Sequence, residues 1–190
     1  MIAYLLIIVL SFSAIVALNT FLSSLTFLYT LKIASIALAI VFAIDAIIAT
    51  IVHAVPERKI NPFAKVFKVS KKECAFYNKL AIKKWKDVIP ECGKFLCHFS
   101  KTSVQNPNSN EYVLKFLRET CYAGVMHFIS IFLGFVPLAF MPQKLTIVLP
   151  IAMVNALLQL LPVLVQRYNR ERLTTLYNFN KRKEERKAWD

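Results

Sequence analysis

The stretch IASIALAIVFAIDAIIATIVHAV, residues 33–55, decides how this chain folds. Asp45 is the only charged residue in the stretch. His53, near the end, is its only other ionisable side chain. The stretch is longer than the roughly 20 apolar residues that a helix needs to cross the hydrocarbon layer of a bilayer. It therefore predicts a transmembrane helix.

Three further apolar runs cover residues 1–31, 121–141 and 145–166. His127 is the only ionisable group of the run at 121–141 apart from the Cys and Tyr at its start. Hydrophobic residues make up 57% of the 190-residue chain, which is too apolar for an ordinary soluble domain. The sequence predicts an all-α integral membrane protein, with four transmembrane helices in a single membrane domain at 1–190.

The N-terminal run has neither a basic segment ahead of it nor a clear small-residue cleavage site. It is also long for a signal peptide, so we interpret it as a retained membrane segment. Asn19, Thr20, Ser23 and Ser24 interrupt the run. The expected span is therefore residues 3–18, followed by a turn in water.

Basic residues predict the orientation in the membrane. Of 24 Lys and Arg residues, 14 lie in the central loop at 56–118 and 8 in the tail at 167–190, while only Lys32 and Lys144 occupy the other two loops. An even number of spans puts the loop, the tail and the N-terminus on one side, and the basic excess makes that side cytoplasmic. We predict a multi-pass protein of the cell membrane with both termini in the cytoplasm.

The net charge of +13 indicates anionic partners. A basic cytoplasmic surface attracts anionic lipid head groups, at about 1 kcal/mol per residue near the surface, and it would also attract a phosphate-bearing substrate. Motifs for base stacking and groove reading are absent, so we expect no nucleic acid partner.

The four cysteines, Cys74, Cys92, Cys97 and Cys121, fall on the predicted cytoplasmic side or at its boundary. A reducing compartment does not favour structural disulfides. Cys92, Cys97 and His98 lack a standard zinc spacing, and no second cluster completes four ligands. We predict no metal site and no cofactor.

Ser70 and Glu73 have the spacing of a capping box, so we expect a helix over residues 71–89 in the loop. One face of this helix is apolar and carries Trp85, and the opposite face carries lysines. A basic amphipathic helix with a Trp suits the plane of the membrane interface. A helix packed on another part of the loop has the same pattern, and both interpretations stay open.

The turn at residues 106–110 precedes an uninterrupted helical pattern, for which Asn108 or Ser109 is the expected cap. We expect one continuous helix, amphipathic at first and then membrane-buried, that Pro137 ends or kinks. Pro162 should bend the fourth helix and free a carbonyl group.

Polar residues on three predicted helices fall at similar depths. At about 1.5 Å per residue from each helix's first cytoplasmic charge, His127 and Gln159 lie about 12–14 Å down, and Asp45 and Asn155 about 18 Å. Intramembrane polar residues mostly face the bundle interior. The pattern predicts a cavity that opens to the cytoplasm and is lined by these four residues. A buried histidine satisfied by a neighbouring helix is the other interpretation of His127.

Glu119 lies at the predicted water boundary. It is eight residues from His127, or about 12 Å along a helix, which is too far for a direct hydrogen bond. The position one turn above His127 would suit an orienting carboxylate, but it holds Gly124.

The fourth run ends in Gln166-Arg167-Tyr168-Asn169-Arg170. Arg167 and Arg170 are neighbours on a helix and can hold a phosphate or carboxylate bidentately. A stop-transfer cluster anchored at the interface is the alternative interpretation.

Three pieces together resemble the glycosyl-4,4′-diaponeurosporenoate acyltransferases: residues 83–87 (Lys-Lys-Trp-Lys-Asp), Glu119-Thr120 with His127, and the Gln-Arg-Tyr-Asn-Arg string at 166–170. The resemblance runs from about residue 61 to residue 176 and includes His98. It implies a membrane-embedded enzyme that esterifies a hydroxyl of a glycolipid or of an isoprenoid or carotenoid glycoside with a fatty acyl group. The family esterifies the glucose of a carotenoid glycoside.

In this interpretation His127 is the general base that deprotonates the hydroxyl. The family carries a glutamate where this chain has Gly124, and a proline where it has Glu171. Either Glu119 or Asp45 then acts as the acid beside His127, or the activity is weakened or altered.

The expected substrate-binding residues are Gln166, Arg167, Tyr168, Asn169, Arg170, Trp85, His98, Asn155 and Gln159. The two arginines of the string would hold the anionic part of an acyl donor, acyl-CoA or acyl carrier protein, or stabilise the oxyanion. The acceptor would be a lipid-linked hydroxyl, and the Trp85 helix would form a lid. The alternative is a non-catalytic membrane protein that binds a lipid or a partner helix.

Overall fold

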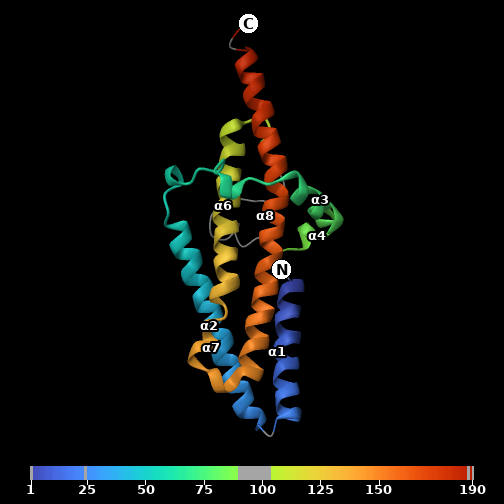
Figure 1. Ribbon diagram of the computed structural model, residues 1–190, viewed down its shortest axis with the longest axis vertical. Helices are drawn as coiled ribbons and strands as arrows, with labels where there is room; N and C mark the ends of the chain where they lie inside the picture. The colour runs from blue at the N-terminus through green and yellow to red at the C-terminus, as the bar shows by residue number, and fades with distance from the viewer. Residues whose placement is uncertain (1, 24, 90–103, 188, 190) are drawn as a thin grey trace. The chain divides into compact units, whose positions relative to one another are not determined.

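The computed structural model describes residues 2–23, 25–89, 104–187 and 189 (Figure 1). All regular structure in this part of the chain is helical, and four of its helices are long and apolar enough to cross a membrane. The predicted all-α, multi-pass architecture is confirmed at this level. The four candidate spans are α1 (Ile2–Leu22), α2 (Phe27–His53), α6 (Asn110–Leu133) continued by α7 (Pro137–Phe140), and α8 (Leu145–Lys187).

The first span continues past the expected residues 3–18, so the turn to the second span comes later than expected. The helix α1 ends at Leu22, and the backbone N–H of Ser23 donates to the carbonyl of Asn19, 3.1 Å away. The Ser23 hydroxyl donates to the same carbonyl. Because α2 already begins at Phe27, Lys32 lies inside this helix and not in the loop before it. Figure 1 shows α1 and α2 running in opposite directions from this turn.

The expected helix boundaries after the central loop are largely observed. Ser109 precedes α6 and its hydroxyl accepts from the Tyr112 backbone N–H at 3.2 Å, as a cap does. Pro162, in contrast, does not interrupt α8, which is continuous over 43 residues. A proline leaves the carbonyl four residues earlier without its helical donor. That carbonyl belongs to Leu158, and the Tyr4 hydroxyl donates to it at 3.2 Å.

The chain divides into two compact units, to both of which α6 and α8 contribute. The apolar unit consists of Met1–Ala54 and Val125–Leu161, and its sequence holds only three Lys, Arg, Asp or Glu residues: Lys32, Asp45 and Lys144. The basic unit consists of Val55–Gly124 and Pro162–Asp190 and holds the remaining 22 Lys and Arg.

Small residues let the helices of the apolar unit pack closely. Ala34 and Ala37 on α2 are 0% exposed and belong to a core with residues of α1 and α8. Such close approach favours helix association where lipid supplies no hydrophobic driving force. The side chain of Asn19 links two of these helices, since its Nδ2 donates to the carbonyls of Ile15 and Thr146 at 2.9 and 3.1 Å.

In the basic unit, the helix expected over 71–89 is divided into α3 (Lys71–Lys79), α4 (Ile82–Trp85) and a 3-10 turn, η3 (Lys86–Val88). The predicted capping box is present, with Ser70 and Glu73 each accepting the other's backbone N–H. The helix breaks at Ala81, whose φ of 51° lies in the left-handed region and costs about 1–2 kcal/mol.

Packing explains this break. Ile82 is 0% exposed and clusters with Tyr77 and with Val165 of α8, and Trp85 packs against the same cluster. The Trp85 indole N–H donates to the Leu80 carbonyl at 3.0 Å, across the turn. These contacts pack the segment on Val69 of the loop and on Val165 of α8, and its place at the membrane interface stays a prediction. Phe76, Leu80 and Val88 remain exposed.

Candidate functional site

Three polar side chains from three helices meet in the apolar unit. His127 of α6 lies with its Nδ1 2.6 Å from the Oε1 atom of Gln159 on α8. The Nε2 of the same amide donates to Oδ2 of Asp45 on α2, also at 2.6 Å. The predicted convergence of polar groups is therefore observed for His127, Gln159 and Asp45, with Gln159 between the other two.

The order of the hydrogen bonds from His127 through Gln159 to Asp45 determines the tautomer of His127. A carboxylate only accepts hydrogen bonds, so Gln159 turns its NH₂ group to Asp45 and its carbonyl oxygen to the imidazole. The Nδ1 of His127 must then carry the proton, and in a neutral imidazole the lone pair resides on Nε2. The amide of Gln159 links Asp45 to His127.

Two atoms beside the hydrogen-bonded side chains of His127, Gln159 and Asp45 have no hydrogen-bond partner among the described residues. They are Asp45 Oδ1 and Asn155 Nδ2. Ser130, which is 1% exposed, lies beside the Asp45 carboxyl group without a hydrogen bond of ordinary geometry to Oδ1. Asn155 is four residues before Gln159 on α8, so the two side chains are neighbours on one helix face. Buried polar atoms are normally paired, so these two are candidates for contacts with a ligand.

Gly134 gives Asn155 the space that its amide occupies. A Cβ atom at position 134 would lie only 2.5 Å from Asn155 Nδ2. A glycine is therefore required at this point for the present position of the amide. By contrast, a Cβ atom at Gly124 would meet nothing within 4 Å.

Arg170 is buried in the basic unit, where it is 5% exposed. Its guanidinium donates to the backbone carbonyls of Phe67 at 2.7 Å, of Leu117 at 3.2 Å and of Pro62, and to the Thr120 hydroxyl at 2.8 Å. It also lies over the Phe67 ring, with 5.0 Å between Cζ and the ring centroid. These contacts join the segment at 62–67 to α6 and α8.

Arg167 is engaged by protein groups as well. It pairs with Glu73, with 2.6 Å between Nη2 and Oε1, and donates to the Tyr77 hydroxyl at 3.2 Å and the Lys68 carbonyl at 3.2 Å. Partial burial opposes the charge on Glu73, but hydrogen bonds from the Ser70 amide and Arg167 outweigh it and lower the pKa of Glu73. The role of both arginines in substrate binding remains a prediction.

The other predicted site residues are dispersed. Gln166 has a buried Oε1 without a hydrogen-bond partner, Tyr168 packs at the edge of the Ile82 cluster, and Asn169 is half-buried. Glu119 is 6% exposed and belongs to the basic unit. His98, Cys92 and Cys97 lie outside the described residues.

Sequence reasoning missed Ser130 and the partners of Arg167. Ser130 follows His127 by three residues and so lies on the same helix face, which is a signal that the sequence does contain.

Cys74, next to Glu73, is not a thiolate nucleophile, because burial and the neighbouring Glu171 raise its pKa to about 11. Within the described residues, no group of three or more His, Cys, Asp or Glu side chains is placed to hold a metal ion.

Comparison with known proteins gives one match. No curated protein and no solved structure matches the chain significantly. The sequence profile described as glycosyl-4,4′-diaponeurosporenoate acyltransferase matches residues 59–178, which include His127, Gln159 and the string at 166–170 but not Asp45. The description implies an acyl donor and a glycosylated carotenoid acceptor. Because the match covers more than half of the 190 residues, the chain belongs to the glycosyl-4,4′-diaponeurosporenoate acyltransferase family.

Proposed function

We propose that this protein is a membrane-embedded acyltransferase that esterifies a sugar hydroxyl of a carotenoid glycoside, or of a related glycolipid, with a fatty acyl group. The observation that carries the proposal is the hydrogen-bonded chain from His127 through Gln159 to Asp45, in a protein of this family. Two ionisable groups, bridged by an amide among candidate membrane spans, are costly to maintain and are therefore functional-site candidates.

In the proposed reaction, His127 Nε2 accepts the proton of the acceptor hydroxyl as its oxygen attacks the acyl carbonyl carbon. The imidazolium keeps its Nδ1–H on Gln159 Oε1, and the Asp45 carboxylate stabilises its positive charge through the polarised amide. When the tetrahedral intermediate collapses, the bond to the donor's leaving group breaks, and His127 returns the proton to that group. The carbonyl re-forms as the product ester.

The basic unit would supply the membrane-facing and donor-facing surface. We propose that it lies on the cytoplasmic side, with both termini there, and that its lysines meet anionic head groups. The donor would then be acyl-CoA or acyl carrier protein from the cytoplasm. The contacts of Arg167 and Arg170 support a positioning role, in which they hold α3 and the segment at 62–68 beside α8.

The test is an acyl-transfer assay with the purified full chain in lipid nanodiscs. Radiolabelled acyl-CoA or acyl carrier protein is offered together with a native lipid extract, and new esters are identified by mass spectrometry. His127→Ala should lower the rate by about 10²–10⁴-fold, the usual contribution of a general base. His53→Ala is the matched control, because His53 lies near the end of α2 with its Nδ1 2.9 Å from the Ala49 carbonyl of the same helix, and this variant should keep the rate.

An unchanged rate in His127→Ala would exclude His127 as the base. Formation of no ester with any donor would instead favour a non-catalytic membrane protein that binds a lipid or a partner helix.

A further inference from the structure

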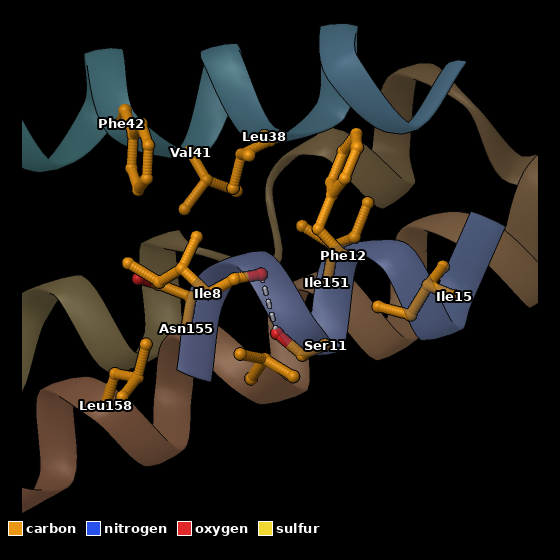
Figure 2. A pocket seen from close by; sticks show the side chains of 11 residues that line it. Ile8, Ser11, Phe12, Ile15, Leu38, Val41, Phe42, Ile151, Asn155 and Leu158 are labelled. Atoms are coloured by element: carbon orange, nitrogen blue, oxygen red, sulfur yellow. Dashed lines mark hydrogen bonds between the residues drawn. The ribbon is translucent and has the colours of Figure 1, made fainter. Parts of the chain in front are cut away.

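A groove lies in the apolar unit between α1, α2 and α8 (Figure 2). Nine of its eleven lining residues are apolar, among them Ile8, Phe12, Leu38 and Phe42, which Figure 2 shows on facing helices. The two polar lining residues are Ser11 and Asn155.

Only one of these polar residues has a donor to offer. The Ser11 hydroxyl already donates within α1, to the carbonyls of Ile7 at 2.6 Å and Ile8 at 3.1 Å. Asn155 is 8% exposed, and its Nδ2 has no hydrogen-bond partner in the described part of the chain. The occupant of the groove should therefore be apolar along its length, with one acceptor oxygen at the level of Asn155.

This requirement separates the possible occupants. A water molecule needs two to four polar partners, whereas the only polar side chains of the lining are Asn155 and Ser11, whose hydroxyl already donates within α1. A partner helix bonds its own backbone carbonyls internally and offers no free acceptor there. A sugar carries many hydroxyls, which the apolar lining would leave unpaired. A fatty acyl chain with its ester or thioester carbonyl meets both conditions.

The position of Asn155 connects the groove with His127. Asn155 precedes Gln159 by one turn of α8, a rise of about 6 Å, and Gln159 bonds His127 directly. We propose that the groove binds the acyl chain of the donor and that Asn155 Nδ2 donates to its carbonyl oxygen; this rests on the proposed acyl transfer. As the hydroxyl attacks, that oxygen becomes the oxyanion of the tetrahedral intermediate, and the same donor stabilises it.

The binding test uses a probe that requires no turnover. A long-chain fatty acid methyl ester with a diazirine near the methyl end of the chain is added to the full chain in nanodiscs and photolysed, and labelled peptides are mapped. We expect labels on groove residues of α1 and α2. Ile8→Trp fills the groove and should abolish this labelling, whereas Val9→Trp, at a neighbouring position that is 58% exposed and does not line the groove, should leave it unchanged.

Asn155→Leu tests the carbonyl contact, because leucine keeps the size of the side chain and removes its donor. Binding of the methyl ester should weaken about tenfold, the usual effect of losing one hydrogen bond. A hydrocarbon probe of equal length, with the diazirine but no carbonyl, should bind wild type and Asn155→Leu equally. Equal ester binding by both proteins would refute the contact with Asn155.

These outcomes are independent of catalysis. Labelling outside the groove, or labelling that survives in Ile8→Trp, would overturn the acyl-chain site even if the enzyme transfers acyl groups. Labelling that Ile8→Trp abolishes, in a protein that forms no ester, would support the site and refute the proposed function.

Discussion

The Arg170 network of the basic unit and the His127 chain of the apolar unit are both polar clusters among apolar helices, but they differ in how fully they are paired. Arg170 donates to three backbone carbonyls and a hydroxyl. The His127 chain leaves Asp45 Oδ1 and the nearby Asn155 Nδ2 without partners among the described residues. Saturated networks fix a structure, while unpaired buried groups mark places where a ligand can bind. The comparison favours a structural role for the first cluster and supports the proposed chemical role of the second.

Asp45→Asn should cause the largest effect. An asparagine can present either its carbonyl or its NH₂ group to Gln159, so it no longer fixes the amide orientation that keeps the proton on His127 Nδ1. The rate of acyl transfer should fall by about 10²–10⁴-fold, as loss of the base itself would cause. The measurement is the initial rate in nanodiscs together with the thermal midpoint, which should change little. A large fall in the midpoint at full rate would assign Asp45 to stability.

Arg170→Ala should act in the opposite way. The substitution removes the donor of the Pro62 and Phe67 carbonyls, at about 1–3 kcal/mol for each group, whereas the Leu117 carbonyl still accepts from the Thr120 hydroxyl. We expect the free energy of unfolding in detergent to fall by about 3 kcal/mol or more. Arg182→Ala, at an exposed position of the tail, is the control. If Arg170→Ala instead kept its stability and lost affinity for the acyl donor, Arg170 would belong to the binding site.

Two glycine substitutions sharpen the assignment of Asn155. Gly134→Ala places a Cβ atom 2.5 Å from Asn155 Nδ2, so the amide must rotate away. Acyl transfer should fall about tenfold, as for loss of one hydrogen bond. Gly124→Ala meets nothing within 4 Å and should raise helix stability by about 1 kcal/mol without lowering the rate. A matching fall in both variants would show that the effect is not specific to Asn155.

The smallest effect should be the contribution of Glu73 to stability at different pH values. The folded state lowers the pKa of Glu73 below 4.5, so the folded chain binds this proton less tightly than the unfolded chain. The resulting stability is present above about pH 4.5 and is lost as the pH falls through the lower folded value. Glu73→Gln should flatten this part of the profile. The side chains of both partners are partly exposed, so we expect a change of less than about 1 kcal/mol. The check is the thermal midpoint of Glu73→Gln and of wild type, measured between about pH 3 and about pH 7. This range includes the ordinary pKa of a glutamate side chain.

Much of the architecture follows from the sequence because long apolar runs have few alternatives in a membrane. The depth argument also brought His127, Gln159 and Asp45 to a common level, since the rise of a helix per residue is constant. The direct partner of His127 was not predicted. The count of residues along a helix gives a level but not the rotation of each helix, so Gln159 was placed in the same polar layer as His127 but was not identified as its partner.

The basic unit was harder to predict because its contacts depend on the backbone. Arg170 bonds carbonyl groups, which every residue possesses and which therefore leave no pattern in the sequence. Ala81 gave no sign of a break, since alanine is the strongest helix former. The burial of Ile82 and Trp85 against Val165, which is distant in sequence, overrides that local preference.

The contacts of Arg170 also bear on the biosynthesis of the protein. Its carbonyl partners at Pro62 and Phe67 are 108 and 103 residues earlier in the chain. At about 5–20 residues per second, a ribosome needs about 5–20 s to reach Arg170 after it has made that segment. During this interval the segment at 62–67 has none of its final hydrogen bonds to Arg170. Completion of the basic unit therefore waits for the last helix, and a chain truncated before residue 170 would leave these carbonyls without this donor.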